Sequence, residues 1–450
     1  MMPAFSKITQ RFTSDRKFSE ILTGSAFALG GRVAATILAL TASIITTRFY
    51  GAEAMGILAM VNSFLLLASI FTVLGTGTSI LRLIPEHIVK HSITSAFRVY
   101  RKIQYLVVAV SLVCGILLFF SSGLLADKVF SKPHLSFFFA LAAGFVVFKS
   151  LADLNTQAIR GMRLIRVFAF MQVLPSATML VLLIAMTLLI PNPGNPVYAQ
   201  LAALGGTAVV GAWIMDRAFR KKMRPDDAVH LMPLKEVMSI SLPMLMTASM
   251  AFAIGQIGVI LLGMFRPERE VGYYSVSVKV ASLTIFALEA INTMAAPKFS
   301  ELFHTGKMDE LFHVARKSTR LIFWTTTPIL LVLLVLGKPI LGFIFGDEFT
   351  AAYLSMVFLV LGQFVNAVSG STGHFMNMTG HQNALKNVIL VTAISNVLLS
   401  LILIPYFGIE GAAFSAMVSQ IFLNVYALMY IKKSYGKTIG YLPLLRWRVR

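Results

Sequence analysis

The stretch LTGSAFALGGRVAATILALTASIITT, residues 22–47, carries a single charged side chain, that of Arg32. An α-helix needs about 20 consecutive apolar residues to cross the hydrocarbon core of a bilayer. A helix that is apolar on all its faces has to be buried in a large protein core or in a membrane. Residues 22–47 therefore predict a transmembrane helix.

Further runs of the same kind follow, so the sequence predicts an all-α polytopic membrane protein of about twelve spanning helices. An even number of spans places both ends of the chain on one side of the membrane. The predicted spans are Leu22–Thr47, Met55–Ser79, Ile103–Leu125, Leu135–Ile159, Val167–Ile190, Val197–Ala218, Val237–Phe265, Val271–Ala296, Leu321–Phe345, Ala351–Met376, Leu385–Ile404 and Ile409–Ile431.

The composition of the whole chain agrees with this prediction. Hydrophobic residues make up 57% of the 450 residues, charged residues 13%, and the mean hydropathy is +0.79. Soluble domains carry about 25% charged residues. The single cysteine, Cys114, excludes a disulfide framework and a metal site built from several cysteines. Residues 1–20 are polar and basic and lack the apolar region of a cleaved signal peptide, so we expect a retained cytoplasmic tail.

Lysine and arginine are distributed unequally between the loops. Thirty of them lie in the tails and in the loops on the same side of the membrane, and six lie in the other loops. Positively charged loops remain in the cytoplasm, which predicts cytoplasmic termini and a multi-pass protein of the bacterial inner membrane. The net charge of +20 is then mainly an insertion signal that also attracts anionic lipid. Nucleic acid is not an expected partner.

The two halves of the chain share a spacing of glycine, proline and phenylalanine. Since each half holds six spans, this spacing predicts two six-helix bundles related by a pseudo-two-fold axis along the membrane normal, with the substrate path between them. The alternative is coincidence among residues at loop edges. The pairs, at offsets of 214 to 219 positions, are Gly56 and Gly272, Phe130 and Phe345, Gly161 and Gly380, and Pro191 and Pro405. The predicted divisions are a cytoplasmic N-tail (1–20), a first bundle (21–219), a cytoplasmic linker (220–236), a second bundle (237–432) and a cytoplasmic C-tail (433–450).

Five ionisable residues fall well inside predicted spans: Arg32, Lys149, Asp153, Lys279 and Glu289. Each costs roughly 2.5–3.5 kcal/mol at the bilayer centre, and such residues usually face a cavity or pair with one another. We predict that the three cations bind substrate and that the two acids act as counter-ions or couple transport to an ion. An excess of cations favours an anionic substrate such as a phosphate or pyrophosphate. The alternatives are an Arg32 that only locks the bundle, and an internal pair between Lys149 and Asp153, which share one helix face.

Sequence motifs of nucleotide-driven or metal-dependent enzymes are absent. The chain has no GxxxxGK[ST] loop, no HExxH, no CxxC and no GxSxG. We therefore predict no catalytic residue, no metal site and no cofactor, and a protein that is not an enzyme. The energy for transport is expected from an ion gradient, from the membrane potential or from mass action.

Six stretches along the chain resemble the lipid-linked oligosaccharide flippases, the polysaccharide-biosynthesis branch of the multidrug/oligosaccharidyl-lipid/polysaccharide exporter superfamily. Each stretch alone matches the family only loosely, and their order along the chain makes the resemblance specific. They are RFYGAEAMGIL (48–58), TSILRLIPE (78–86), EVGYYSVSVKVASL (270–283), INTMAAPKFSEL (291–302), FMNMTGHQNALKN (375–387) and LIPYFGIEGAAFSA (403–416).

This resemblance implies a central cavity, alternating access, and an undecaprenyl-pyrophosphate-linked oligosaccharide as substrate for surface polysaccharide biosynthesis. It also implies a glycan polymerase of the same pathway as a partner. Two other functions stay open. One is a multidrug or organic-cation antiporter of the same superfamily. The other is a membrane-embedded glycan polymerase or ligase, which would need a long outer loop with polar catalytic residues that the sequence lacks.

Overall fold

The structure is a computed structural model that describes residues 16–223 and 230–443, and every regular element in these two ranges is helical. Residues 1–15, 224–229 and 444–450, which belong to the predicted N-tail, linker and C-tail, lie outside the described residues. The first helix begins at Arg16, so the last part of the predicted N-tail is helical. The all-α prediction is confirmed.

The helices of the first half are α2 (Arg16–Val73), α3 (Thr76–Lys90), α4 (Ile93–Leu124), α5 (Ser136–Gly161), α6 (Ile165–Leu189) and α7 (Asn195–Arg220). A π turn (Leu125–Val129) and a short 3-10 turn (Pro133–Leu135) join α4 to α5. The helices of the second half are α8 (Leu234–Phe265), α9 (Glu268–Ser282), α10 (Ile285–His304), α11 (Met308–Phe345), α12 (Tyr353–Ser369), α13 (Thr372–Met378) and α14 (Gln382–Tyr435), with a 3-10 turn (Asp347–Ala352) before α12.

Two helices are each long enough for two spans. A straight α2 of 58 residues would measure roughly 87 Å at about 1.5 Å per residue, against about 30 Å of hydrocarbon. Instead Gly51 (φ 79°, ψ −177°) turns α2 back into a second arm, residues 52–73, and Gly408 (φ 53°, ψ −128°) does the same in α14. The described residues contain nine sufficiently long apolar helices, and α9 with α10 makes a tenth span. With both double helices counted twice, the predicted twelve spans are confirmed.

Three predicted spans are broken rather than continuous. The span predicted at Met55–Ser79 is interrupted between the end of α2 and the start of α3, because Leu74 and Gly75 adopt φ +52° and +75°. The span predicted at Val271–Ala296 bends by 43° between α9 and α10, where Leu283 and Thr284 donate backbone hydrogen bonds to carbonyls three residues earlier. The span predicted at Ala351–Met376 ends at Ser369 and resumes as α13, because Gly370 adopts φ +70°. The long connection predicted near residues 299–320 is also mostly helical, since α10 ends at His304 and α11 begins at Met308.

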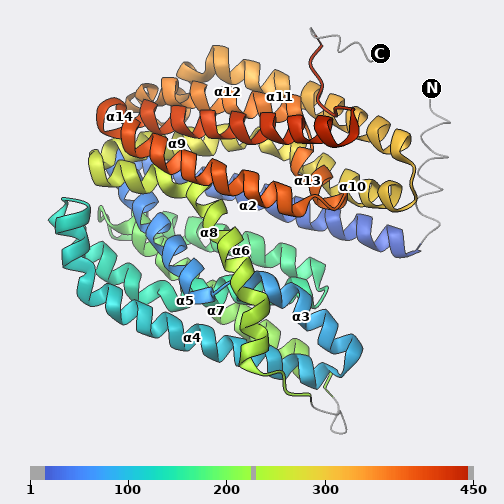
Figure 1. The fold of residues 1–450 in the computed structure, drawn as a ribbon. Coiled ribbons are helices and arrows are strands. Elements are labelled where there is room, and N and C mark those ends of the chain that lie inside the picture. The colour runs from blue at the N-terminus through green and yellow to red at the C-terminus, as the bar shows by residue number, and fades with distance from the viewer. Residues whose placement is uncertain (1–15, 224–229, 444–450) are drawn as a thin grey trace.

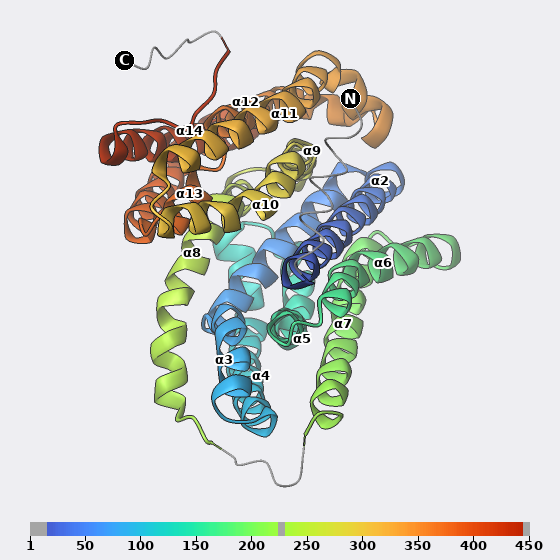
Figure 2. The same ribbon diagram turned by 90° about the vertical axis from the view of Figure 1, so that its right-hand side faces the viewer.

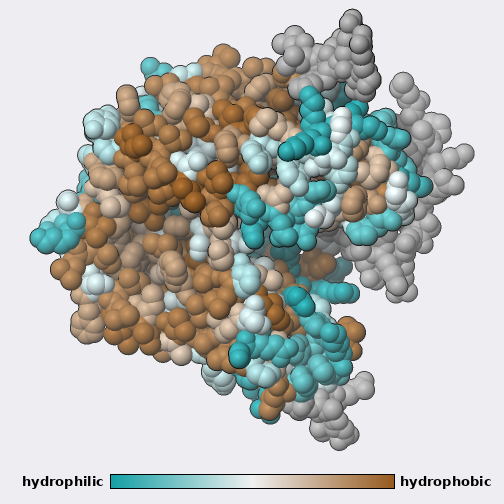
Figure 3. All heavy atoms as spheres, in the orientation of Figure 1, coloured by the Kyte–Doolittle hydropathy of each residue, from teal (hydrophilic) through white to brown (hydrophobic). Residues whose placement is uncertain are grey.

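The molecule has one polar end and a broad apolar band. Helix α2 begins and α14 ends at the same end, which we call the proximal end, and both helices turn back at the opposite, distal end (Figure 1). The non-helical residues of these two turns are Gly51 and Gly408. Hydrophilic side chains gather at the proximal end, and brown apolar side chains cover most of the remaining surface in this view (Figure 3). This is the surface of a protein that spans a membrane several times.

The two halves of the chain form two groups of helices. Helices α3 to α7 lie together in one group, and α9 to α14 lie in the other, with α2 between them (Figures 1 and 2). Helix α8 connects the groups, because it packs on α3 near its start and on α14 further along (Figure 2). The seams between the groups therefore run between α2 and α9–α10 on one side, and between α2–α3 and α8 on the other.

Backbones from the two halves meet directly at the distal end. A Cβ placed on Gly56 of α2 would lie 1.8 Å from the carbonyl oxygen of Glu268, and a Cβ on Gly272 of α9 would lie 2.1 Å from that of Ala52. Each of the two positions therefore has to be glycine, because the backbone of the other helix occupies the space that a side chain would need. Small residues allow this close approach of membrane helices. The offset of 216 noted between Gly56 and Gly272 in the sequence marks this crossing.

We expect Gly56→Ala to separate α2 from α9 at the distal end, because its Cβ would collide with a backbone carbonyl that cannot move alone. Overpacking typically costs about 1–3 kcal/mol. The melting temperature of the purified protein should fall by several degrees. Gly206→Ala is the matched control, since its Cβ would meet nothing within 4 Å. Equal melting temperatures for the two variants would contradict the role of this crossing.

Candidate functional site

The first seam carries two of the predicted cations. Arg32, in the first arm of α2, donates a hydrogen bond from Nη1 to Oε2 of Glu289 on α10 at 3.2 Å. Both side chains remain open to the surroundings, with exposed fractions of 54% and 33%. Nearer the distal end, the Lys279 ammonium donates to the Ser43 hydroxyl at 2.6 Å and has no carboxylate partner within the described residues. This seam therefore holds one exposed ion pair and one unpaired cation.

Lys149 and Asp153 lie inside the first half. Their side chains pair along α5 at 2.6 Å, and the Ser69 hydroxyl of α2 donates to the same carboxylate at 3.3 Å. The Lys149 side chain is 15% exposed and that of Asp153 42%. Among the described residues, no hydrogen bond or ion pair joins this pair to Arg32 or Lys279. The i, i+4 pairing is the internal pair that the sequence left open as an alternative.

The second seam has a neutral link at the matching position. The Ser63 hydroxyl of α2 donates to Oε1 of Gln256 on α8 at 3.0 Å. Ser43 and Gln256 are 213 positions apart, and Ser63 and Lys279 are 216 apart, so this link is the pseudo-symmetric counterpart of Lys279 to Ser43. Sequence reasoning assigned neither Gln256 nor either serine to a seam, and only the repeat offset could have identified the two serines.

The proximal ends of the two seams differ. On the second seam the Ser79 and Ser241 hydroxyls are 2.7 Å apart, and a Cβ on Gly75 would lie 2.1 Å from the carbonyl oxygen of Ser241. Backbone contact seals that seam between α3 and α8. On the first seam the corresponding region holds the exposed pair of Arg32 and Glu289. The exposed, charged contact between the halves is therefore on the first seam.

Charged side chains reinforce the distal end. Lys132, before α5, donates to the carbonyl oxygens of Gly263 at 2.9 Å and Arg266 at 2.6 Å, at the end of α8. Burial lowers the pKa of the Lys132 ammonium, and the nearby carboxylate of Glu268 opposes that effect. His134 approaches the same carboxylate at 2.9 Å. A side chain of the first half thus satisfies carbonyls at the end of α8, where a helix lacks internal partners.

The second half likewise supplies a side chain to a helix end of the first half. The Glu348 carboxylate accepts a hydrogen bond at 2.9 Å from the backbone N–H of Ala52, where the second arm of α2 starts, and pairs with Arg269 at 3.0 Å. The guanidinium of Arg48 donates to the carbonyl oxygens of Phe343 and of Ile344, the latter at 3.1 Å, at the end of α11. The distal end is closed by side chains that each half supplies to helix ends of the other.

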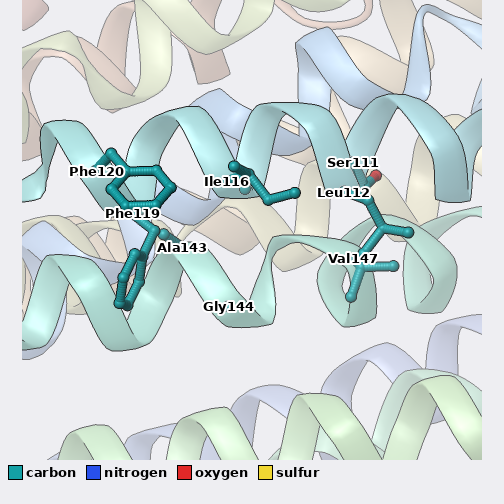
Figure 4. Close-up of a pocket in the computed structure, with 9 residues that line it drawn as sticks. Ser111, Leu112, Ile116, Phe119, Phe120, Ala143, Gly144 and Val147 are labelled. Atoms are coloured by element: carbon teal, nitrogen blue, oxygen red, sulfur yellow. The ribbon is translucent and has the colours of Figure 1, made fainter.

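Two apolar grooves lie outside these contacts. The groove between α4 and α5, about 240 Å³, is lined by residues such as Leu112, Ile116, Phe119 and Phe120 (Figure 4). Phe120 is 80% exposed there, so this groove belongs to the lipid-facing surface. A second groove of about 510 Å³ borders the second seam between α2, α8 and α14. Charged residues line neither groove, and neither groove includes a predicted site residue.

A family model described as polysaccharide biosynthesis protein matches residues 45–354, which is well over half of the chain. The chain belongs to this polysaccharide biosynthesis family. The matched region begins within the first arm of α2 and ends in α12, so it includes both seams and the distal end. The resemblance seen in the sequence is confirmed.

Two curated relatives are similar over part of their length. The probable low-salt glycan biosynthesis flippase Agl15 of Haloferax volcanii is 24% identical over 36% of this chain and 34% of its own length. The capsular polysaccharide biosynthesis protein CapF of Staphylococcus aureus is 20% identical over 52% of this chain and 59% of its own. The chain therefore matches between about a third and three fifths of these relatives.

Two solved structures share the fold of this family member. Lipid II flippase MurJ, in an inward closed conformation, gives a TM-score of 0.70 at 14% identity, covering 91% of this chain and 87% of that one. An inward-facing multidrug resistance MATE family transporter of the MOP superfamily gives a TM-score of 0.67 at 15% identity, covering 90% of this chain and 98% of that one. The two-bundle arrangement predicted from the sequence agrees with these neighbours.

The family member also carries a histidine cluster at the proximal end, outside the spans. The His91 ring, after α3, stacks on His230 of the segment before α8 with centroids 4.1 Å apart, and His87 is 5.5 Å from His91. The backbone N–H of His230 donates to the Ser95 hydroxyl at 2.8 Å, and the Lys102 ammonium donates to the Met232 carbonyl at 2.6 Å. In the described residues, no group of three such side chains is placed to hold a metal ion. These contacts attach the start of the second half to the first.

The pKa of His91 is lowered, first by desolvation and then by His230, His87 and Lys90, while Glu86 opposes the shift. A lowered pKa means that the unfolded chain binds more protons just below about pH 6.5, so stability rises with pH across that window. We expect the melting temperature to fall on acidification from about pH 7.5 to about pH 5.5, and to fall less in His91→Phe, which keeps the ring but cannot be protonated. His304→Phe, at an exposed position on α10, is the control and should follow the natural protein.

Proposed function

We propose that this protein is a flippase that moves undecaprenyl-pyrophosphate-linked oligosaccharide across the cytoplasmic membrane for surface polysaccharide biosynthesis. Membership of the polysaccharide biosynthesis family and the flippase names of relatives support the transport of a lipid-linked glycan. The observation that carries the proposal is the exposed pair of Arg32 and Glu289 on the first seam. The Arg32 side chain is 54% exposed, and its guanidinium is suited to bidentate binding of a phosphate.

Arg32 and Lys279 would act together on the pyrophosphate. The phosphate would replace Glu289 as the partner of Arg32, and Lys279, which holds only the Ser43 hydroxyl, would contribute a second charge further along the same seam. The exchange costs little Coulomb energy because one anion replaces another at the guanidinium. Lys149, already neutralised by Asp153, would influence the substrate through the field of the first half or contact acidic sugars.

Movement would follow alternating access. With the distal end closed by Gly56 and Gly272 and by the exchanged helix-end contacts, substrate would enter from the proximal side and leave after that closure opens. Asp153 and Glu289 would return the cations to their paired state after release, or couple the cycle to an ion. The positive loops support a cytoplasmic proximal end. Anionic lipid at that end and a glycan polymerase at the distal end are the partners we propose.

Charge reversal at the seam tests the substrate-binding role. We expect Arg32→Glu to abolish glycan export while the protein remains in the membrane, because two carboxylates would then face each other. Purified Arg32→Gln should bind undecaprenyl pyrophosphate about tenfold or more weakly than the natural protein, since one charge-assisted contact is worth about 1.5–3 kcal/mol. Surface glycan on cells and titration with undecaprenyl pyrophosphate in detergent micelles are the measurements.

The double variant Arg32→Gln, Glu289→Gln separates substrate binding from a structural lock. It removes both charges together, so neither charge is left without its partner. If Arg32 binds the pyrophosphate, export stays abolished in the double variant. Export near the natural level would show that the pair only joins α2 to α10, and the binding role would be wrong.

A comparison of two lysines tests which cations take part. Lys279→Met should reduce export and undecaprenyl pyrophosphate binding by about tenfold, because it removes a cation with no carboxylate partner. Lys149→Met is the matched control inside the first half, where Asp153 already neutralises the charge. A larger loss from Lys149→Met than from Lys279→Met would contradict this assignment.

The organic-cation antiporter remains the second candidate, since the fold is shared with a MATE family transporter. It predicts that deletion sensitises cells to cationic dyes while surface glycan stays intact. The flippase proposal predicts the reverse: surface glycan is lost and dye sensitivity is unchanged. A polymerase or ligase would instead leave lipid-linked single repeat units on the outer leaflet, which surface labelling of the deletion strain would detect.

A further inference from the structure

The distal end of the second half contains a pocket apart from both seams. Its volume is about 850 Å³, within the range of about 300–1,000 Å³ typical of ligand pockets. Helices α9, α12 and α14 enclose it with apolar and aromatic side chains, among them Tyr273, Leu354, Phe358 and Phe414. Three charged residues at the pocket, Arg266, Glu270 and Glu410, complete the lining.

The charges of this pocket are unequal. The Arg266 guanidinium donates to the carbonyl oxygens of Ile404 at 3.4 Å and Pro405 at 3.1 Å, and approaches the Glu270 carboxylate at 3.9 Å. Its charge is therefore already shared. Glu410 makes no hydrogen bond or ion pair with any described residue, and its carboxylate and that of the nearby Glu270 repel each other. The pocket thus holds an excess of one negative charge on a half-buried carboxylate.

The matching place in the first half has neutral contacts instead of charges. Tyr50 stands where Arg266 stands, 216 positions earlier, and the Ile190 carbonyl corresponds to that of Ile404 at an offset of 214. Here the buried amide of Asn195 donates to the Ile190 carbonyl at 2.7 Å and to the Tyr50 hydroxyl at 3.2 Å. Arg266 therefore introduces a charge in the second half at a position where the first half has a tyrosine.

We propose that this pocket binds a glycerophospholipid with a primary ammonium headgroup, of the phosphatidylethanolamine type, from the distal leaflet. An ammonium carries three N–H donors and one positive charge, which matches the unpaired Glu410 beside Glu270. The lipid phosphate lies toward Arg266, and an acyl chain occupies the apolar part of the pocket along Leu354 and Phe414.

The surroundings place the pocket at headgroup depth. Tyr406 and Phe407, in the turn between the arms of α14, are 79% and 60% exposed beside it. Aromatic residues of this kind concentrate where lipid headgroups meet the hydrocarbon. An anionic lipid would bring a second negative charge to Glu410, and a quaternary ammonium has no N–H to donate. The lipid preference therefore follows from the carboxylate.

Native mass spectrometry of the full chain in detergent, with lipids of identical acyl chains, tests the proposal. We expect phosphatidylethanolamine to be retained about tenfold more than phosphatidylglycerol, and more than phosphatidylcholine, because one charge-assisted contact distinguishes them. Glu410→Gln should remove the preference and Glu410→Asp should keep it. The matched control is Glu53→Gln, which removes an exposed carboxylate at the same distal end.

A second variant tests the pocket without touching its charges. Ala351→Trp, at an exposed lining position, should fill the apolar part and reduce retention of all three lipids. Equal retention of phosphatidylethanolamine and phosphatidylglycerol by the natural protein would overturn the proposal. So would an unchanged preference in Glu410→Gln, or an equal loss in Glu53→Gln. None of these results depends on which glycan is transported, so they test the lipid site independently of the flippase proposal.

Discussion

The contact between the backbones of Gly56 and Gly272 is the constraint on which the arrangement of the two halves depends. It brings α2 and α9 so close that no side chain fits between them, and it does so at one end of the molecule only. The first seam runs from this crossing toward the proximal end, where Arg32 is exposed. In a membrane, where lipid is as apolar as leucine, such packing holds helices together in place of a hydrophobic driving force.

The charges inside the membrane fall into two kinds. Lys149 and Asp153 neutralise each other along one helix, and this pairing lowers the cost of placing them in lipid. Arg32 and Lys279 instead connect the two halves, one through a carboxylate and the other through a hydroxyl. A charge at the boundary between moving bodies can change partners during a cycle, whereas a charge paired within one helix cannot.

Much of the fold could be predicted from the sequence, because membrane spans follow from length and hydropathy alone. The breaks at Leu283 and Gly370 could not be predicted. The first depends on backbone hydrogen bonds between residues three apart, and at the second Thr319 occupies the space that a side chain would need. The ionisable residues in the spans were visible, but their partners were not: Glu289 is 257 positions from Arg32. Hydroxyl groups that complete the seams look like ordinary polar residues until the repeat is superposed.

The exchanged helix-end contacts at the distal end have a consequence for biogenesis. The second arm of α2 starts with an N–H that only Glu348 satisfies among the side chains described here, and α8 ends with carbonyls that Lys132 satisfies. During synthesis the first six spans enter the membrane before residue 348 has been translated. The backbone N–H of Ala52 therefore gains its side-chain partner only once residue 348 has been added, so the turn at the distal end is completed late in synthesis.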